Sequence, residues 1–167
     1  MEYSYRRITG PELGLLPALL EVFAEVFDEP ETYLRAVPRE EYVRRLLQQD
    51  TFIALVALAG DKVVGGLAAY ELEKFEQERS EIYIYDLGVR ESHRRKGVAT
   101  GLIEELRMIA RARKAWVIFV QADPGDTAAI KLYESFGARE SVYQFDIPVG
   151  GAARDRRSQE ASQAAEE

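Results

Sequence analysis

Apolar and polar residues alternate with helical and strand periods over most of the first 149 residues. An apolar residue recurs every three or four positions from Leu13 to Phe27, and a weaker repeat runs from about Arg39 to Gln48, so both segments are predicted to be helices. Gly60-Asp61 lies between two later segments that are predicted to be strands, and it predicts a hairpin turn. The remaining predicted elements are strands at 52–58, 63–73 and 81–89, a helix at 98–112, a strand at 116–122, a helix at 127–136 and a strand at 141–148. This order predicts one α/β (α+β mixed) domain in which helices flank a mixed sheet.

The pattern ends near the C-terminus. After Pro148-Val149-Gly150-Gly151 the chain has neither an aromatic nor a β-branched residue. Such a segment buries too little apolar surface to offset the entropy lost on ordering. We therefore expect a domain over residues 1–149 and a disordered tail over residues 150–167.

Charge and cysteine content narrow the classes of partner and chemistry. The chain has 22 Lys and Arg against 29 Asp and Glu, a net charge of -7, which argues against nucleic acid or an anionic membrane and favours a cationic partner. It has no cysteine and one histidine, so disulfides, thiolate nucleophiles and a metal-ligand set are not expected. Its apolar runs are too short to span a bilayer, and its first residues lack a signal-peptide pattern, so we expect a cytoplasmic protein.

The most informative segment joins the strand that ends at Val89 to the helix that opens at Gly97. Unpaired N–H groups and the positive dipole end at a helix start favour a phosphate, and Gly97 allows a ligand to approach the backbone closely. Three cations, Arg94, Arg95 and Lys96, stand in this loop of an acidic domain. The alternative is a solvated basic loop before an ordinary helix. The spacing excludes both the P-loop and the dinucleotide-binding glycine motif.

Arg94-x-x-Gly97-x-Ala99 resembles the loop that binds the acyl-CoA pyrophosphate in the GNAT superfamily of N-acetyltransferases. Its position between a long strand and an amphipathic helix agrees with that resemblance, and Ala129 to Ala138 is similar to a second element of the superfamily. The resemblance implies a central, mostly antiparallel mixed sheet and acetyl-CoA as acetyl donor. It implies that the following residues line the cofactor: Leu87, Val89, Arg94, Arg95, Lys96, Gly97, Val98, Ala99 and Thr100.

Other segments resemble the gentamicin-type aminoglycoside 3-N-acetyltransferases. They are residues 51–55, 75–87, 120–126 and 145–147. The resemblance implies acetyl transfer to the 3-amino group of a cationic aminoglycoside, antibiotic resistance, and a homodimer held through an apolar sheet edge or the last strand. Because the chain has no cysteine to carry the acetyl group, direct attack by the amine is favoured.

Two residues are candidates for catalysis. Asp86 is an unusual residue inside a strand and precedes the basic loop, so it is a candidate base for the amine; alternatively it pairs with an arginine or caps a bulge. Tyr133 matches the residue that the superfamily uses to protonate the departing CoA thiolate; alternatively it is a core tyrosine.

Further acidic residues are candidates for orienting a polycationic substrate, together with Tyr83. The carboxylates are those of Glu81, Asp123, Asp126 and Asp146. Asp126 also suits the N-cap of the helix that begins at Thr127. Two other functions stay open: acetylation of another small amine, such as a polyamine or amino sugar, and a non-catalytic acyl-CoA-binding module. The basic loop and Tyr133 together argue against the module.

Overall fold

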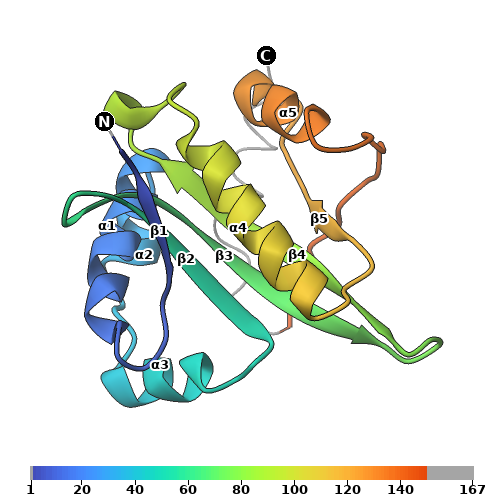
Figure 1. Ribbon diagram of the computed structural model, residues 1–167, viewed down its shortest axis with the longest axis horizontal. Coiled ribbons are helices and arrows are strands. Elements are labelled where there is room, and N and C mark those ends of the chain that lie inside the picture. The colour runs from blue at the N-terminus through green and yellow to red at the C-terminus, as the bar shows by residue number, and fades with distance from the viewer. Residues whose placement is uncertain (1, 150–167) are drawn as a thin grey trace. The chain divides into compact units, whose positions relative to one another are not determined.

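The computed structural model describes residues 2–149. The chain forms two compact units, which divide between Ser135 and Phe136. The first unit contains all the helices and strands of the described residues (Figure 1). In chain order they are β1 (Ser4–Arg7), the 3-10 helix η1 (Leu13–Leu15), α1 (Leu16–Val26), α2 (Pro30–Tyr33), α3 (Glu40–Leu47), β2 (Phe52–Ala59), β3 (Lys62–Lys74), β4 (Arg79–Val89), the 3-10 helix η2 (Glu91–His93), α4 (Val98–Ala112), β5 (Ile118–Val120) and α5 (Thr127–Glu134).

The five strands form one mixed sheet in the order β1-β2-β3-β4-β5. Neighbouring strands are antiparallel except β4 and β5, which are parallel. The predicted hairpin is confirmed, because β2 and β3 are joined at Gly60, whose φ of 62° suits a tight turn. The predicted mixed, mostly antiparallel sheet with flanking helices is confirmed as well.

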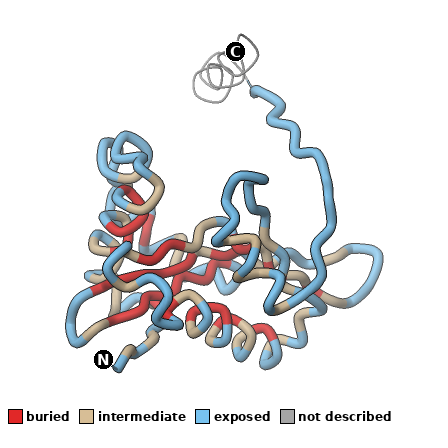
Figure 2. The backbone as a smooth tube through the Cα atoms, turned by 90° about the horizontal axis from the view of Figure 1, so that it is seen from above, coloured by how far each residue is buried: buried red, intermediate tan, exposed pale blue. Residues whose placement is uncertain are grey.

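Each face of the sheet carries its own hydrophobic core. Buried residues of β2, β3 and β4 pack with Leu102 and Leu106 of α4 on one face. On the other face, the alternate residues of β2 pack with Val22 and Phe23 of α1. The buried positions accordingly follow the strands and the inner sides of these helices (Figure 2). A side chain's place in the site is therefore set first by which face of the sheet its strand position presents.

Four elements differ from the sequence predictions. The strand predicted at 141–148 is wrong, because this segment joins no ladder among the described residues and a strand needs a neighbouring backbone to bond. The strand predicted at 116–122 is shorter, since β5 spans only Ile118–Val120. Two short elements, β1 and α2, were not predicted, because four residues are too few to show a period.

A glycine on β3 permits the close approach of α1 to the sheet. A Cβ at Gly66 would lie 2.5 Å from the carbonyl oxygen of Leu55 on β2 and would overlap the side chain of Leu19 on α1. The carbonyl belongs to the sheet ladder and cannot move away without breaking the register. Gly66 is therefore required by packing on both neighbours.

We expect Gly66→Ala to lower the free energy of unfolding by about 1–3 kcal/mol, the usual cost of overpacking a core. Gly14→Ala is the matched control, because a Cβ at Gly14 meets nothing within 4 Å. Urea unfolding of both variants measures the difference. Equal stability of the two would show that the sheet and α1 can separate at no cost.

Candidate functional site

A bulge in β4 decides which face of the sheet Asp86 occupies. Ile84 pairs with Ala69 of β3 and Asp86 with Ala68, so Tyr85 is an extra residue without a partner in the ladder. Ala69 lies in the core under α4, whereas Ala68 packs against the core under α1. Because directly paired residues share a face, the bulge moves Asp86 from the α4 face to the α1 face.

Asp86 is half-buried on that face and receives one hydrogen bond. The hydroxyl of Tyr33 donates to its Oδ1 at 3.0 Å. Burial raises the pKa of Asp86, the Tyr33 hydrogen bond opposes that rise, and the charge of Glu29 adds to it. The result is a carboxyl with a raised pKa, which makes it a stronger base than an exposed aspartate.

On the side of β4 that faces β5, no strand formed by residues 2–149 pairs with β4 beyond Ile84. The parallel ladder with β5 pairs Ile82 with Ile118 and ends at Ile84 with Val120. Leu87 and Val89, predicted to contact a cofactor, lie in this last part of β4, where β3 is the neighbouring strand. Backbone groups that would otherwise join a ladder with β5 therefore face this edge.

The basic loop leads into an uncapped helix start. Gly97, the residue before α4, has a φ of 80°, and no side chain caps the helix there. Arg95 also has a positive φ, of 56°. The side chain of Arg94 bonds back to the carbonyl of Val89 at 3.1 Å, and that of Lys96 to the carbonyl of Ser92 at 2.8 Å. The loop thus combines free helix amides with three cations, which suits a phosphate group.

Gly97 and the residues after it decide whether the start of α4 has room for an acyl-CoA. A Cβ at Gly97 would meet no protein atom within 4 Å, so the positive φ and not close packing requires a glycine, and the space beside it is open to a ligand. Among the predicted residues Val98 is buried, whereas Ala99 is half-buried and Thr100 exposed. The backbone amides of the first turn are therefore accessible to an anionic ligand. These residues fit the diphosphate of an acyl-CoA.

Tyr133 is half-buried near the end of α5. Burial raises its pKa to about 12, and the charge of Asp126 contributes to the rise. Its hydroxyl is thus protonated at neutral pH, and the raised pKa makes it a weaker acid than an exposed tyrosine. Asp126 caps the same helix, since its Oδ1 accepts the N–H of Ala129 at 2.9 Å. The capping role considered for Asp126 from the sequence is confirmed.

The other predicted acidic residues occupy different places. Glu81 lies near the N-terminal end of β4, 3.7 Å from Arg79 and 4.0 Å from Lys74, so these cations partly offset its charge. Asp123 is exposed in the turn before α5. Asp146 belongs to the second unit, where its Oδ1 accepts a hydrogen bond from Gln144.

Aromatic rings cross four strands next to Asp86. The ladder pairs place Phe52, Tyr70, Tyr83 and Phe119 on one face of the sheet, the face of Ala68 and Asp86. The ring of Tyr83 stacks on that of Phe119 with centroids 5.0 Å apart, and Tyr70 meets Phe52 at 5.3 Å. Tyr85, the bulge residue, contacts both Tyr70 and Tyr83 and is 64% exposed. We call these five residues the aromatic row.

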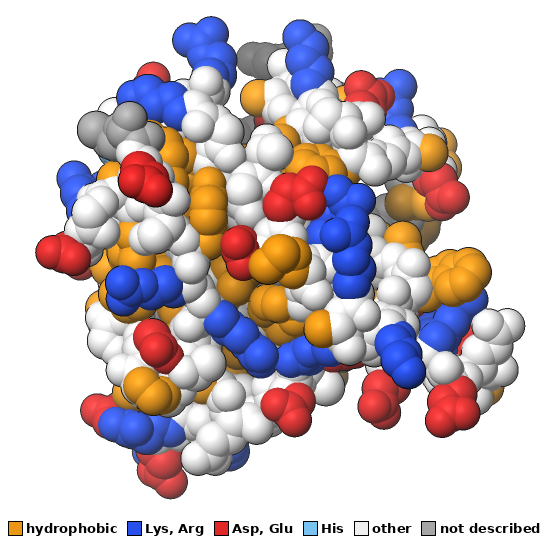
Figure 3. Space-filling model, viewed as in Figure 1, with side chains coloured by type: hydrophobic (Ala, Val, Ile, Leu, Met, Phe, Trp, Pro, Cys, Tyr) orange, Lys and Arg blue, Asp and Glu red, His pale blue; other side chains and the backbone are white. Residues whose placement is uncertain are grey.

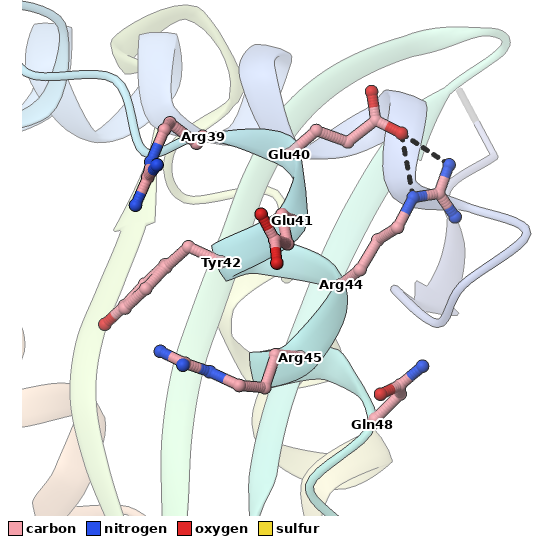
Figure 4. Close-up of a pocket in the computed structure, with 7 residues that line it drawn as sticks. All are labelled: Arg39, Glu40, Glu41, Tyr42, Arg44, Arg45 and Gln48. Carbon is pink, nitrogen blue, oxygen red and sulfur yellow. Dashed lines mark hydrogen bonds and ion pairs between the residues drawn. The ribbon is translucent and has the colours of Figure 1, made fainter.

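Two open surface hollows lie elsewhere and contain none of the predicted site residues. One is formed by α3 and its start, with Tyr42 and Arg45 on one side and the Glu40–Arg44 ion pair on the other (Figure 4). The other lies between α1 and the β2–β3 hairpin. Residues of a single helix line most of the first hollow. We therefore take the surroundings of Asp86, and not this hollow, as the candidate functional site.

Tyr33 was missed by the sequence analysis. It lies on α2, four residues long, in a stretch without a recognisable period. The bulge, in contrast, is visible in the apolar pattern of the sequence. The residues under α4 are Ile82 and Ile84 before the bulge and Leu87 and Val89 after it, so the apolar positions change from even to odd numbers. That change requires one extra residue between Ile84 and Leu87.

Comparison with known proteins agrees with this geometry. Residues 16–138 match the model of the acetyltransferase (GNAT) family. The chain is 54% identical to an aminoglycoside acetyltransferase, HMB0005, from an uncultured soil metagenomic sample, with 90% of this chain and 100% of that chain covered and a TM-score of 0.88. A second aminoglycoside acetyltransferase from such a sample, meta-AAC0020, was solved with sisomicin; it is 31% identical, with 89% and 97% covered and a TM-score of 0.82. None of the curated proteins compared matches the chain.

The chain therefore belongs to the GNAT family of acetyltransferases. This confirms the family and fold inferred from Arg94-x-x-Gly97-x-Ala99. Charges of both signs are mixed over the face that carries α4 (Figure 3), so the net charge of -7 is not gathered in one patch there. None of the helices formed by residues 2–149 has the length and apolar character that a membrane span requires.

The raised pKa of Asp86 predicts a cost in stability. Below the pKa of the unfolded chain both states carry the proton, and as pH rises through the folded-state pKa the buried carboxyl must ionise at a cost. We expect Asp86→Asn, which keeps an acceptor for Tyr33, to raise the melting temperature by a few degrees at pH 7. The gain should shrink as pH falls toward 4.

Calorimetry between pH 4.5 and pH 8 measures this difference. Asp123→Asn, which neutralises an exposed carboxylate, serves as the control and should leave the melting temperature unchanged at each pH. A melting temperature of Asp86→Asn below that of the wild type at every pH would contradict the assignment of burial as the main influence on Asp86.

Proposed function

We propose that this protein transfers the acetyl group of acetyl-CoA directly to the 3-amino group of aminoglycosides and so confers resistance to them. The observation that carries this proposal is the presentation of Asp86, beside the aromatic row, in a chain 54% identical over nearly its whole length to an aminoglycoside acetyltransferase. The family places the protein among acetyltransferases. The proposal adds the acetyl donor, the substrate class and the amino group that is acetylated.

The residues that would hold acetyl-CoA are those of the basic loop and the start of α4. The first-turn amides after Gly97 and the cations Arg94, Arg95 and Lys96 bind the diphosphate. When bound, acetyl-CoA supplies an acetyl thioester, which an amine converts to an amide with release of the CoA thiol. Leu87 and Val89 line the β4 edge between the loop and Asp86.

Asp86 removes the proton from the attacking amine. An ammonium group has no free electron pair, so it must lose one proton before it attacks the thioester. The nitrogen loses a second proton as the amide forms, and that proton balances the one that the sulfur receives. The raised pKa of Asp86 brings it closer to that of the amine than an ordinary aspartate would be. Tyr133 supplies a proton from its hydroxyl to the sulfur, so that the leaving group departs as a thiol.

The aromatic row and nearby carboxylates bind the substrate. Aminoglycosides present several ammonium groups on sugar rings, which are attracted by carboxylates and by the faces of aromatic rings. Tyr83 and Tyr85 offer such faces next to Asp86. Asp123 adds a negative charge at the start of the turn before α5. In this proposal Glu81 and Asp126 contribute negative charge at longer range, and Asp146 of the second unit stays a predicted substrate residue.

Assembly and location stay predictions. The resemblance of the sequence implies a homodimer, and the composition favours the cytoplasm. Sedimentation of the purified protein at several concentrations measures the first, and fractionation of cells that express it measures the second.

We expect the protein to release thiol from acetyl-CoA with gentamicin or sisomicin and to acetylate the 3-amino group. Mass spectrometry and NMR of the product identify the acetylated nitrogen. Aminoglycosides whose 3-amine is blocked should not react. Turnover of spermidine without turnover of any aminoglycoside would instead support acetylation of another amine, and acetyl-CoA binding without any turnover would support a non-catalytic module.

We expect Tyr133→Phe to lower kcat about 10- to 1000-fold through loss of the general acid, with little change in the affinity for CoA. Steady-state kinetics and calorimetric titration with CoA measure the two quantities. Tyr5→Phe is the matched control, because Tyr5 is a half-buried tyrosine on β1 that packs beside the α4 core. Unchanged kcat in Tyr133→Phe would assign Tyr133 to packing.

A further inference from the structure

In the segment between α1 and α3, the side chain of Tyr33 packs against the hydrophobic core on the α1 face of the sheet. Of residues 28–37, Tyr33 alone is not exposed to solvent. Its ring packs against Phe23 and Phe27 of α1, with centroids 5.7 Å and 5.9 Å apart. The ring of Tyr33 therefore anchors this segment, and its hydroxyl takes no part in that packing.

That polar end reaches the candidate base. The ring passes over α1, and its hydroxyl donates to Oδ1 of Asp86 at 3.0 Å, 53 residues further along the chain. No other donor to Asp86 is found among residues 2–149. One carboxylate oxygen is thus occupied by the protein, and Oδ2 is left to accept a proton from a substrate.

Burial and Glu29 oppose the ionisation of Asp86, and the Tyr33 hydroxyl favours it. Glu29, just before α2, raises the pKa of Asp86 by its charge. Burial raises the pKa of Tyr70 on β3, and the charges of Tyr42, Asp86 and Tyr85 add smaller contributions. Burial and Asp86 raise the pKa of Tyr33 itself, so its hydroxyl stays protonated and remains a donor.

We propose that Tyr33 is a positioning residue, which holds the Asp86 carboxylate in its charged form with Oδ2 directed to the amine. This inference rests on the proposed function, because it assigns Tyr33 a role through the base of that reaction. The hydrogen bond stabilises the carboxylate relative to the carboxylic acid. Because it is made to only one of the two oxygens, the hydrogen bond also fixes the rotation of the carboxyl group.

The test is Tyr33→Phe, which keeps the ring between Phe23 and Phe27 and removes only the hydroxyl. Carbon-13 NMR titration of the free protein follows the Asp86 carboxyl, and its pKa should move to higher pH in the variant. In kinetics with acetyl-CoA and sisomicin, kcat should fall about 10-fold at pH 6 and less than about 3-fold at pH 8, because less Asp86 is ionised at low pH. Tyr5→Phe should change neither measurement.

The double variant Tyr33→Phe/Asp86→Asn separates action through Asp86 from a loosened segment. If Tyr33 acts through Asp86, Tyr33→Phe has no further effect on kcat once Asp86 is Asn. An equal loss at every pH, or a loss that persists in the double variant, would overturn the proposal and make Tyr33 a packing residue only. Thermal unfolding of both tyrosine variants shows that each is folded in the assays.

The NMR titration and the kinetic assay distinguish a failure of this inference from a failure of the proposed function. If aminoglycosides are not acetylated, the proposed function fails, and the NMR titration still decides whether Tyr33 sets the ionisation of Asp86. If they are acetylated and the Asp86 pKa is the same in Tyr33→Phe, only the role of Tyr33 fails.

Discussion

The candidate site depends on one extra residue in β4. Core packing determines the face of β4 on both sides of the bulge: Ile84 lies under α4 before it, and Val89 lies under α4 after it. In a regular strand Asp86 would share the face of Ile84 and be buried among the apolar residues under α4, where an unpaired carboxylate is costly. Tyr85 absorbs the change of register, so the sheet retains both cores and presents one carboxylate on the opposite face.

The same strand joins two regions of opposite charge. Its end, at Val89, leads directly into the cations of the basic loop, and Asp86 lies three residues earlier, about 10 Å along an extended strand. The ladder with β5 has already ended at Ile84, so within the described part of the chain no strand pairs with this edge of β4 between the two regions. An anionic donor and a cationic acceptor, as proposed, would thus meet along this edge, each attracted by its own end.

Much of the fold could be predicted because its long elements have clear periods. The helix over Val98–Ala112 and the hairpin at Gly60 came from residue pattern alone. The partner of Asp86 could not be predicted, since Tyr33 lies on a four-residue helix and its hydrogen bond joins residues 53 positions apart. The segment at 141–148 shows the opposite limit: its alternation is that of a strand, and alternation specifies a face without supplying a neighbouring strand to bond.

The environment of Asp86 balances two opposing effects on its basicity. Burial and Glu29 favour the protonated form, which makes the carboxylate a stronger base, but a base that already carries a proton cannot accept one. The Tyr33 hydroxyl favours the charged form and limits that loss. Under the proposed function, the half-buried carboxyl therefore costs some stability, and its role is proton transfer and not packing.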